Sequence, residues 1–197
     1  MSSALQADLF AAAPPAPEGF SYAPALITPA EEAALMAELA ALPFAPFDFH
    51  GHLANREVVG FGFRYDYSRR AVMAAPPIPD FLAPLRDKVG AFAGLAGADF
   101  VQLLINRYRP GAGIGWHKDK PQFETVAGVS LGAPCLFRFR RKAGAGWDRL
   151  SLTVEPRSAY LLTGPARHEW EHSIPPLDAP RYSITFRTLA APAQDRY

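Results

Sequence analysis

Cysteine is almost absent from this sequence of 197 residues, since Cys135 is its only one. A single thiol excludes a framework of internal disulfides and suits a reducing compartment, so we expect a cytoplasmic protein. Long apolar runs are missing too, and no stretch approaches the roughly 18 residues that suggest a membrane span. The first residues lack the basic segment with which a secretory signal begins. These absences predict a soluble protein without a membrane partner, and a monomer is favoured.

Excess charge of either sign is missing over the whole chain, whose formal net charge is +1. The balance is uneven, however, because residues 1–60 hold one basic residue against seven acidic ones, whereas residues 61–197 hold 19 against 12. A basic second part attracts polyanions such as nucleic acid, but an ordinary solvated surface carries similar charge. Charge alone does not decide between the two.

Apolar residues make up nearly half of the chain, which is enough for the core of one domain. Residues 1–19 are rich in Ala and Pro and predict a flexible leader. An N-terminal extension over residues 20–98 follows, with helices expected at 29–42 and 79–94. The first helix begins with Thr28-Pro29-Ala30-Glu31, which has the form of a capping box with proline at the first helical position.

Residues 99–190 consist of short apolar segments separated by Gly and Pro, a pattern typical of strands. We expect strands there at 100–108, 113–119, 125–131, 134–141, 149–155, 159–163 and 181–188. Two more are expected within residues 44–67, joined by an exposed turn at His50-Gly51-His52. The pattern predicts a mainly β fold with flanking helices, in which two helices pack against one sheet of a sandwich or jelly roll.

Two potential metal ligands lie in the segment IGWHKD, residues 114–119. Alternate side chains of a strand share a face, so His117 and Asp119 point the same way. An imidazole and a carboxylate are two of the three ligands in the facial triad of non-haem iron(II). The third ligand would be His168 or His172, both in the run ARHEWEHSIPP. A histidine and an aspartate that form a hydrogen-bonded pair on the surface would give the same sequence pattern.

The segment RYSITFR, residues 181–187, places Arg181 and Arg187 on one face of a strand whose other face is apolar. Arginines in a core are costly unless they meet anions. A dicarboxylate that bridges both would satisfy them through forked hydrogen bonds, although an exposed face would also accommodate them. Another expected strand places Asn106 and Tyr108 on one face, where they offer donors to a carboxylate or a keto acid.

Taken together, these segments resemble the AlkB family of iron(II)- and 2-oxoglutarate-dependent dioxygenases. The runs that match in order and spacing over residues 99–189 are INRYRPGAGIGWHKD, SLGAPCLFRFRR, PRSAYLLTG, WEHSIPP and RYSITFR. The resemblance implies a double-stranded β-helix, and it implies iron(II), 2-oxoglutarate and O2 for oxidative attack on a C–H bond. It also implies that His172 is the third ligand beside His117 and Asp119, with His168 a neighbour.

The resemblance further implies a pocket for 2-oxoglutarate. Arg181 resembles the arginine that pairs with the distal carboxylate, and Arg187 resembles the one near the carboxylate at the keto end. The remaining positions that match this pocket are Leu104, Asn106, Tyr108, Ile114, Ser183 and Thr185.

A modified nucleobase in DNA or RNA, possibly tRNA, is the substrate that the resemblance favours. A protein side chain is the alternative, and a jelly-roll binding module without turnover is a third. Residues 55–68 look like the nucleotide-binding lid of the family, where the candidates for stacking or phosphate contact are Arg56, Phe61, Phe63, Arg64, Tyr65 and Tyr67. Two core strands with aromatic packing would give the same pattern. The basic run over residues 138–142 could contact a backbone, although such a run is more often simply solvated.

One departure from the family lies at Pro121, two positions after Asp119. Some DNA-repair members carry an acidic residue there, which is available to recognise a base. Its absence argues against repair of alkylated adenine or cytosine and leaves RNA, notably tRNA, or protein open as substrates.

Overall fold

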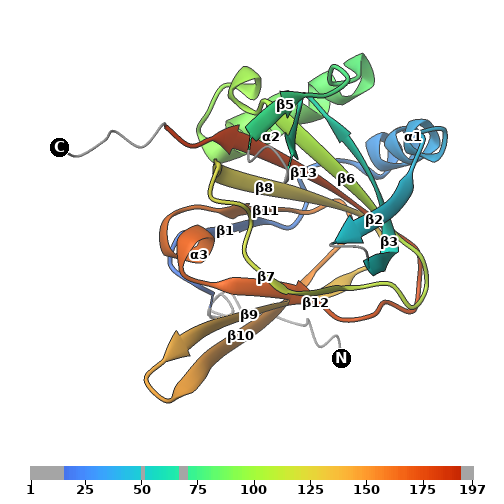
Figure 1. Cartoon of the computed structure of the whole chain (residues 1–197). Helices are drawn as coiled ribbons and strands as arrows, with labels where there is room; N and C mark the ends of the chain where they lie inside the picture. The colour runs from blue at the N-terminus through green and yellow to red at the C-terminus, as the bar shows by residue number, and fades with distance from the viewer. Residues whose placement is uncertain (1–15, 50–51, 67–70, 192–197) are drawn as a thin grey trace, which may run out of the picture.

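The computed structural model of the protein describes residues 16–49, 52–66 and 71–191 (Figure 1). Its helices are α1 (Pro29–Ala40), α2 (Ala83–Ala93) and α3 (Gly164–His168), with short 3-10 turns at Asp80–Leu82 and Gly97–Asp99. Its strands are β1 (Phe20–Ala23), β2 (Ala45–Phe49), β3 (His52–Phe61), β4 (Phe63–Asp66), β5 (Ala71–Ala74), β6 (Gln102–Tyr108), β7 (Ile114–His117), β8 (Phe123–Gly132), β9 (Cys135–Ala143), β10 (Gly146–Val154), β11 (Ala159–Leu162), β12 (Glu171–Ile174) and β13 (Arg181–Leu189).

Two antiparallel sheets lie face to face. The large sheet has the strand order β1-β11-β8-β13-β6-β3-β2, and the small sheet has the order β10-β9-β12-β7. Strands β4 and β5 form a separate ribbon. Helices α1 and α2 cover the outer side of the large sheet, and the small sheet lies on its other side (Figure 1). The mainly β jelly roll with flanking helices that the sequence predicts is therefore confirmed.

The large sheet is buried on both faces, so its strands supply two separate cores. Leu103, Ile184 and Phe186 point toward the helices and join the core that lies beneath them. Tyr108 and Tyr160 point the other way, into the core between the two sheets. Because side chains alternate along a strand, the polar residues between the helix-side positions must also enter the space between the sheets. That space holds the candidate site.

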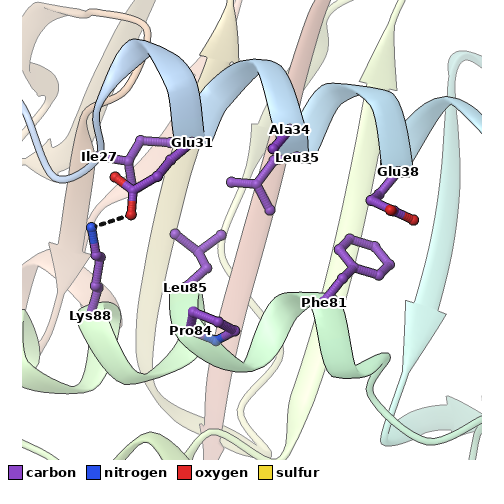
Figure 2. Close-up of a pocket in the computed structure, with 9 residues that line it drawn as sticks. All are labelled: Ile27, Glu31, Ala34, Leu35, Glu38, Phe81, Pro84, Leu85 and Lys88. Atoms are coloured by element: carbon purple, nitrogen blue, oxygen red, sulfur yellow. Dashed lines mark hydrogen bonds and ion pairs between the residues drawn. The ribbon is translucent and has the colours of Figure 1, made fainter.

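Helix α1 begins at the predicted capping box. The Thr28 hydroxyl accepts a hydrogen bond from the Glu31 backbone N–H at 3.2 Å, and the Glu31 carboxylate accepts one from the Thr28 N–H at 2.8 Å. Figure 2 shows α1 and α2 side by side, with Leu35 facing Leu85 and the Lys88 ammonium 2.5 Å from the Glu31 carboxylate. The hollow between the helices thus belongs to the helix-side core. Among the described helices, none combines the length and apolar character needed to cross a membrane.

The predicted elements agree with the structure except at a few short segments. Strands β1, β5 and β12 and helix α3 were not expected, and the described part of residues 44–67 forms three strands rather than two. The second predicted helix begins as the 3-10 turn at Asp80. The expected turn at 50–52 falls largely outside the described residues, as does most of the leader at 1–19. Its last four residues are described, and the carbonyls of Glu18 and Gly19 accept hydrogen bonds from Ala166 and Thr163. Those four residues therefore belong to the folded part.

Candidate metal and anion site

Two histidines from distant parts of the chain lie opposite each other in the small sheet. Strand β12 pairs with β7 so that His172 stands opposite His117, and their ring centroids are 4.3 Å apart. The carbonyl of Gly115 lies 2.9 Å from His117 Nδ1 and can only accept a hydrogen bond, so Nδ1 carries the proton. The lone pair of His117 is then on Nε2. Phe137 stacks on the His172 ring at 5.3 Å and fixes its plane.

Asp119 follows β7 and shares this site. Its Oδ1 accepts hydrogen bonds from Arg187 Nε at 3.0 Å and Nη2 at 2.8 Å, and its Oδ2 lies 3.6 Å from His172 Nε2. Burial is the largest single influence and would raise the pKa of the Asp119 carboxyl, but the surrounding positive groups, led by Arg187, together outweigh it and lower the pKa below its ordinary value. Asp119 is therefore a carboxylate, with one oxygen held by Arg187 and the other turned toward His172.

Both histidines are neutral at neutral pH. Burial disfavours the imidazolium form, which lowers the pKa of His117 and lowers that of His172 to about 3. The 3.6 Å contact between His172 and Asp119 is consequently not an ion pair at neutral pH. Neutral imidazoles beside a carboxylate are the protonation states that a divalent metal requires of its ligands.

The three side chains fit a metal ion by chemistry and by position, although they are not closed around one. Among the described residues, no three His, Cys, Asp or Glu side chains form a ready-made metal cluster. Ligand atoms about 2 Å from one ion lie roughly 3 Å from each other, and His172 Nε2 and Asp119 Oδ2 are only slightly farther apart at 3.6 Å. Two histidines and one carboxylate form the donor set of the facial triad for iron(II).

A fully buried arginine lies on the same side of the large sheet. Arg181 has no exposed surface, and its Nε donates to the Ser130 hydroxyl at 3.0 Å. Its Nη1 and Nη2 atoms are buried and have no hydrogen-bond partner among the described residues. A buried cation left in this state costs several kcal/mol, and a carboxylate that accepts both N–H groups would remove the cost. The cradle fits the carboxylate of an organic acid.

All but one of the other residues predicted to line this pocket share one face of the large sheet, and the exception, Ile114, lies on the small sheet. Cross-strand pairs place Arg181 opposite Tyr108, Ser183 opposite Asn106, and Thr185 opposite Leu104. All of them follow the alternation that carries Arg181 and Arg187 toward the small sheet. Ile114, on β7, packs against the core between the sheets. The structure thus brings together every residue that the sequence associated with the cosubstrate.

Several residues of the site were not predicted from sequence. Arg167, in α3, is buried and donates to the carbonyls of Asp119 at 3.2 Å, Lys120 at 2.5 Å and Phe123 at 2.5 Å. Gln102 accepts from Arg187 Nη1 at 2.9 Å. Neither residue has a sequence signal, because their partners lie 44 or more positions away. Ser130 could have been suspected, since it lies in the run SLGAPCLFRFRR.

One further unpredicted feature is the contact between Gly128 and Tyr160. A side chain at Gly128 would collide with the Tyr160 ring, so glycine lets that ring cross the neighbouring strand. Burial raises the pKa of the Tyr160 hydroxyl, which stays protonated at neutral pH.

His168 lies apart from the candidate ligands. Its Nε2 lies 2.9 Å from the Glu124 carboxylate, and the side chain is 46% exposed. It is a surface histidine, as the resemblance implies. His50 lies outside the described residues, and the side chain of His52 is not described.

The candidate substrate residues of the N-terminal extension divide into three groups. Phe61 is 7% exposed and lies in the helix-side core, so the prediction that it could stack on a substrate is wrong. Arg56 is buried and donates to Asn106 Oδ1 at 3.2 Å, so it faces the cosubstrate pocket rather than an outer surface, contrary to a role on an external phosphate. Phe63 is half-buried in β4. Tyr67 and the side chains of Arg64 and Tyr65 lie outside the described residues.

Comparison with known proteins shows the family of this chain. Residues 19–187 match the family model described as the 2OG-Fe(II) oxygenase superfamily. The chain therefore belongs to the 2OG-Fe(II) oxygenase superfamily, whose members use iron(II) and 2-oxoglutarate.

Individual relatives and one solved structure show which proteins of the superfamily this chain is similar to. An alkylated DNA repair protein ALKBH8 homolog of Arabidopsis thaliana is 30% identical over 181 residues, covering 80% of this chain and 51% of its own. The tRNA (carboxymethyluridine(34)-5-O)-methyltransferase alkbh8 of Xenopus tropicalis is 32% identical over 130 residues, covering 63% of this chain and 20% of its own. The chain thus spans about half of the length of the first of these relatives and a fifth of the second.

The solved structure of OsALKBH1 has the same fold, with a TM-score of 0.64 at 15% identity over 86% of this chain and 98% of that one. Within the superfamily the chain thus has AlkB-like relatives, and it shares its fold with OsALKBH1.

Proposed function

We propose that this protein is an AlkB-like dioxygenase that oxidises a modified nucleobase in DNA or RNA. In this proposal His117, Asp119 and His172 hold iron(II), and Arg181 and Arg187 bind 2-oxoglutarate. The observation that carries the proposal is the fully buried Arg181, whose two terminal nitrogens lack partners among the described residues. An uncompensated buried cation is costly, and one carboxylate of a dicarboxylate would remove that cost.

The roles of the chain's own residues follow from their contacts. Arg187 holds Asp119 Oδ1 and so directs Oδ2 toward His172, while the Gly115 carbonyl fixes the His117 tautomer. Fixing ring and carboxylate orientation in this way raises metal affinity, because the ligands need little rearrangement to bind. Arg181, anchored by Ser130, binds the distal carboxylate of the cosubstrate.

Iron(II) and 2-oxoglutarate, when bound, supply the oxidation of a substrate C–H bond by O2, with succinate and CO2 as coproducts. The surrounding residues keep water away from that chemistry. His172, Arg181, Ser183 and Thr185 are all buried, and Phe137 and Tyr160 pack behind them in the core between the sheets. A dry site strengthens the electrostatic contacts on which binding of the two anionic ends depends.

The nucleic-acid substrate is supported by relatives rather than by a contact in this chain. One relative is a DNA repair protein by name, and another is a tRNA methyltransferase by name. Exposed Pro121, next to the metal-binding segment, offers no side-chain hydrogen bond to a base. This favours substrates other than alkylated adenine and cytosine in DNA, with RNA, including tRNA, as the preferred class.

The test is turnover of 2-oxoglutarate in the presence of iron(II) with methylated DNA oligonucleotides, RNA oligonucleotides and tRNA. We expect succinate to form and the mass of one nucleic acid to change. His172→Ala should abolish both signals, and His168→Ala should leave them intact, because only His172 lies at the triad. Equal loss in both variants, or turnover by His172→Ala, would contradict the ligand assignment. A mass change confined to a protein substrate would contradict the nucleobase assignment.

A further inference from the structure

The outer face of the small sheet carries a concentration of cations and indoles that the proposed active site does not use. Register pairs β9 with β10 so that Arg140 stands opposite Arg149 and Lys142 opposite Trp147. The alternate residues Phe137 and Phe139 of β9 are buried in the core between the sheets. We call the opposite side the cation–indole face, made of Trp116, Arg138, Arg140, Lys142, Trp147 and Arg149.

The side chains of the cation–indole face stack on one another in a continuous row. The Arg140 guanidinium lies 4.6 Å from the centroid of Trp116 and 4.4 Å from that of Trp147. Arg138 lies 5.1 Å from the Trp116 centroid, and the Lys142 ammonium lies 5.2 Å from the Trp147 centroid. Aromatic rings and cations within about 6 Å attract each other, so the row holds its side chains in place before any ligand arrives.

Positive charge on this face is only partly neutralised. Arg140 pairs with Glu171 at 2.5 Å, and Arg138 Nε donates to the neutral Ser173 hydroxyl at 3.0 Å. Arg149 is exposed, and neither it nor Lys142 makes an ion pair with a described residue. Four cations thus face one carboxylate. The surface is complementary to a polyanion.

The inner side of the β9–β10 hairpin contacts the rest of the fold without using this row. There Arg141 pairs with Glu169 at 2.8 Å and Asp148 at 3.3 Å and lies over Trp170 at 4.8 Å. Figure 1 shows the β9–β10 hairpin projecting beyond the other strands. Trp147, on that projection, is 37% exposed. An exposed indole among cations is a feature of binding surfaces rather than of solvated ones.

We propose that the cation–indole face binds single-stranded nucleic acid, outside the site formed by His117, Asp119 and His172. Indoles stack on bases of any sequence, and the cations between them meet the phosphates, which is the arrangement of sequence-independent single-strand binders. A hollow lined by Trp116, Arg138, Arg149 and Ser151 lies in this surface. Trp116 directly precedes His117 in β7, so one strand carries both sites on opposite faces. The inference rests on the proposed function for the class of polymer, and it assigns this face the nucleotides that flank the target.

The test is the affinity of the full-length protein for unmodified single-stranded DNA and RNA oligonucleotides, measured by fluorescence anisotropy. Trp147→Ala should weaken binding about tenfold, the loss expected when one stacked base is released. Arg149→Gln should reduce the slope of log affinity against log salt by about 0.7, the value for one phosphate contact on a single strand. The controls are Leu95→Ala, which truncates a side chain 37% exposed elsewhere, and Lys88→Gln, which removes a cation from the helix side.

Trp147→Ala and Arg149→Gln could both bind with unchanged affinity while the wild type still turns over a nucleobase. That result would overturn the assignment of nucleic-acid binding to the cation–indole face and would leave the proposed function standing. Binding that depends on Trp147, in a protein that turns over no nucleobase, would support the face and contradict the proposed function. Equal losses in the Lys88→Gln control would show that net charge alone attracts the polymer and would overturn the assignment. Competition by polyglutamate as strong as that by the oligonucleotide would do the same, because a peptide offers no bases to stack.

Discussion

Arg181 combines complete burial with hydrogen-bond donors that remain unused. Its Nε is anchored by Ser130, its guanidinium lies 5.2 Å over the Tyr108 ring, and its two terminal nitrogens are buried without partners among the described residues. Replacing an unpaired buried cation with an apolar side chain of similar length is often neutral or stabilising. The same replacement removes the guanidinium that the pocket offers to a carboxylate.

Arg181→Met should therefore separate stability from binding. We expect the thermal unfolding midpoint without cosubstrate to be unchanged or higher. The affinity for 2-oxoglutarate should fall at least 100-fold, the equivalent of the roughly 3–5 kcal/mol lost with a buried ionic partner. Calorimetric titration and thermal unfolding of the same sample measure both quantities. Arg149→Met, at an exposed arginine, is the matched control, and equal 2-oxoglutarate affinity in the wild type and Arg181→Met would show that the anion binds elsewhere.

Pro121 governs a second prediction at the residue scale. The wild type should act poorly on 1-methyladenine and 3-methylcytosine in DNA, because the side chain of an exposed proline at this position cannot hydrogen-bond to a base. Pro121→Asp should increase the rate on these two bases, with Pro121→Ala as the control for loss of the ring. Nucleoside mass spectrometry after timed reactions gives the rates. Rapid repair by the wild type would mean that another residue supplies the contact.

At the scale of elements, helix α3 holds the segment that carries the candidate ligands, and we call this set of contacts the clamp. Arg167, on this five-residue helix, binds the backbone carbonyls of Asp119, Lys120 and Phe123 across the turn from β7 to β8. Because α3 leads directly into β12, the same short helix also sets where His172 enters the sheet. The clamp therefore couples two segments that are distant in sequence.

Arg167→Met should loosen that clamp. The carbonyls of Asp119 and Phe123 would lose this donor, whereas that of Lys120 keeps the Phe123 backbone N–H at 3.1 Å. We expect the free energy of unfolding to fall by about 2–4 kcal/mol, since each unsatisfied buried group costs about 1–3 kcal/mol. Metal affinity should drop roughly 10- to 100-fold, the usual effect of losing a residue that orients a ligand. Urea unfolding and titration with a divalent metal test the two parts. The exposed Arg109→Met variant should change stability by less than about 1 kcal/mol, and a similarly small effect in Arg167→Met would contradict the clamp.

Element boundaries also show which parts of the site could be predicted from sequence. The capping box fixed the start of α1, and alternation placed Arg181 and Arg187 on one face of β13, because both signals are local. Strand β12 was missed since its four residues, EHSI, are short and polar and become a strand only by pairing with β7 and β9. Phe61 was misassigned for a related reason. Period two shows that residues alternate, but in a sheet buried on both faces it does not show which face meets the helices.

At the scale of the whole molecule, acid stability depends on contacts between strands. Glu57, on β3, accepts hydrogen bonds from Arg109, just after β6, and from Arg107, on β6. These hydrogen bonds, that of Arg109 first, lower the pKa of Glu57 from 4.5 to about 2. A carboxyl whose pKa is depressed in the folded state stabilises the fold fully above the unfolded value near 4.5. This contribution is lost as the pH falls from about 4.5 toward 2.

The difference in unfolding free energy between the wild type and Glu57→Gln should follow that window. Arg109 is 66% exposed, so solvent screening limits the difference at pH 7 to about 1 kcal/mol. It should shrink through pH 4 and approach zero near pH 2. Urea unfolding at several pH values measures it. A difference that stays constant down to pH 2 would show that the ion pairs do not cause it.

One measurement tests directly whether the buried site oxidises nucleic acid. Purified protein, iron(II) and 2-oxoglutarate are incubated with methylated RNA, tRNA and DNA, and succinate and nucleoside masses are quantified together. We expect succinate formation coupled to the loss or oxidation of one modified nucleoside, and neither signal in Arg181→Met. Succinate formation that no nucleic acid stimulates, with every nucleoside mass unchanged, would contradict nucleic-acid oxidation at this site.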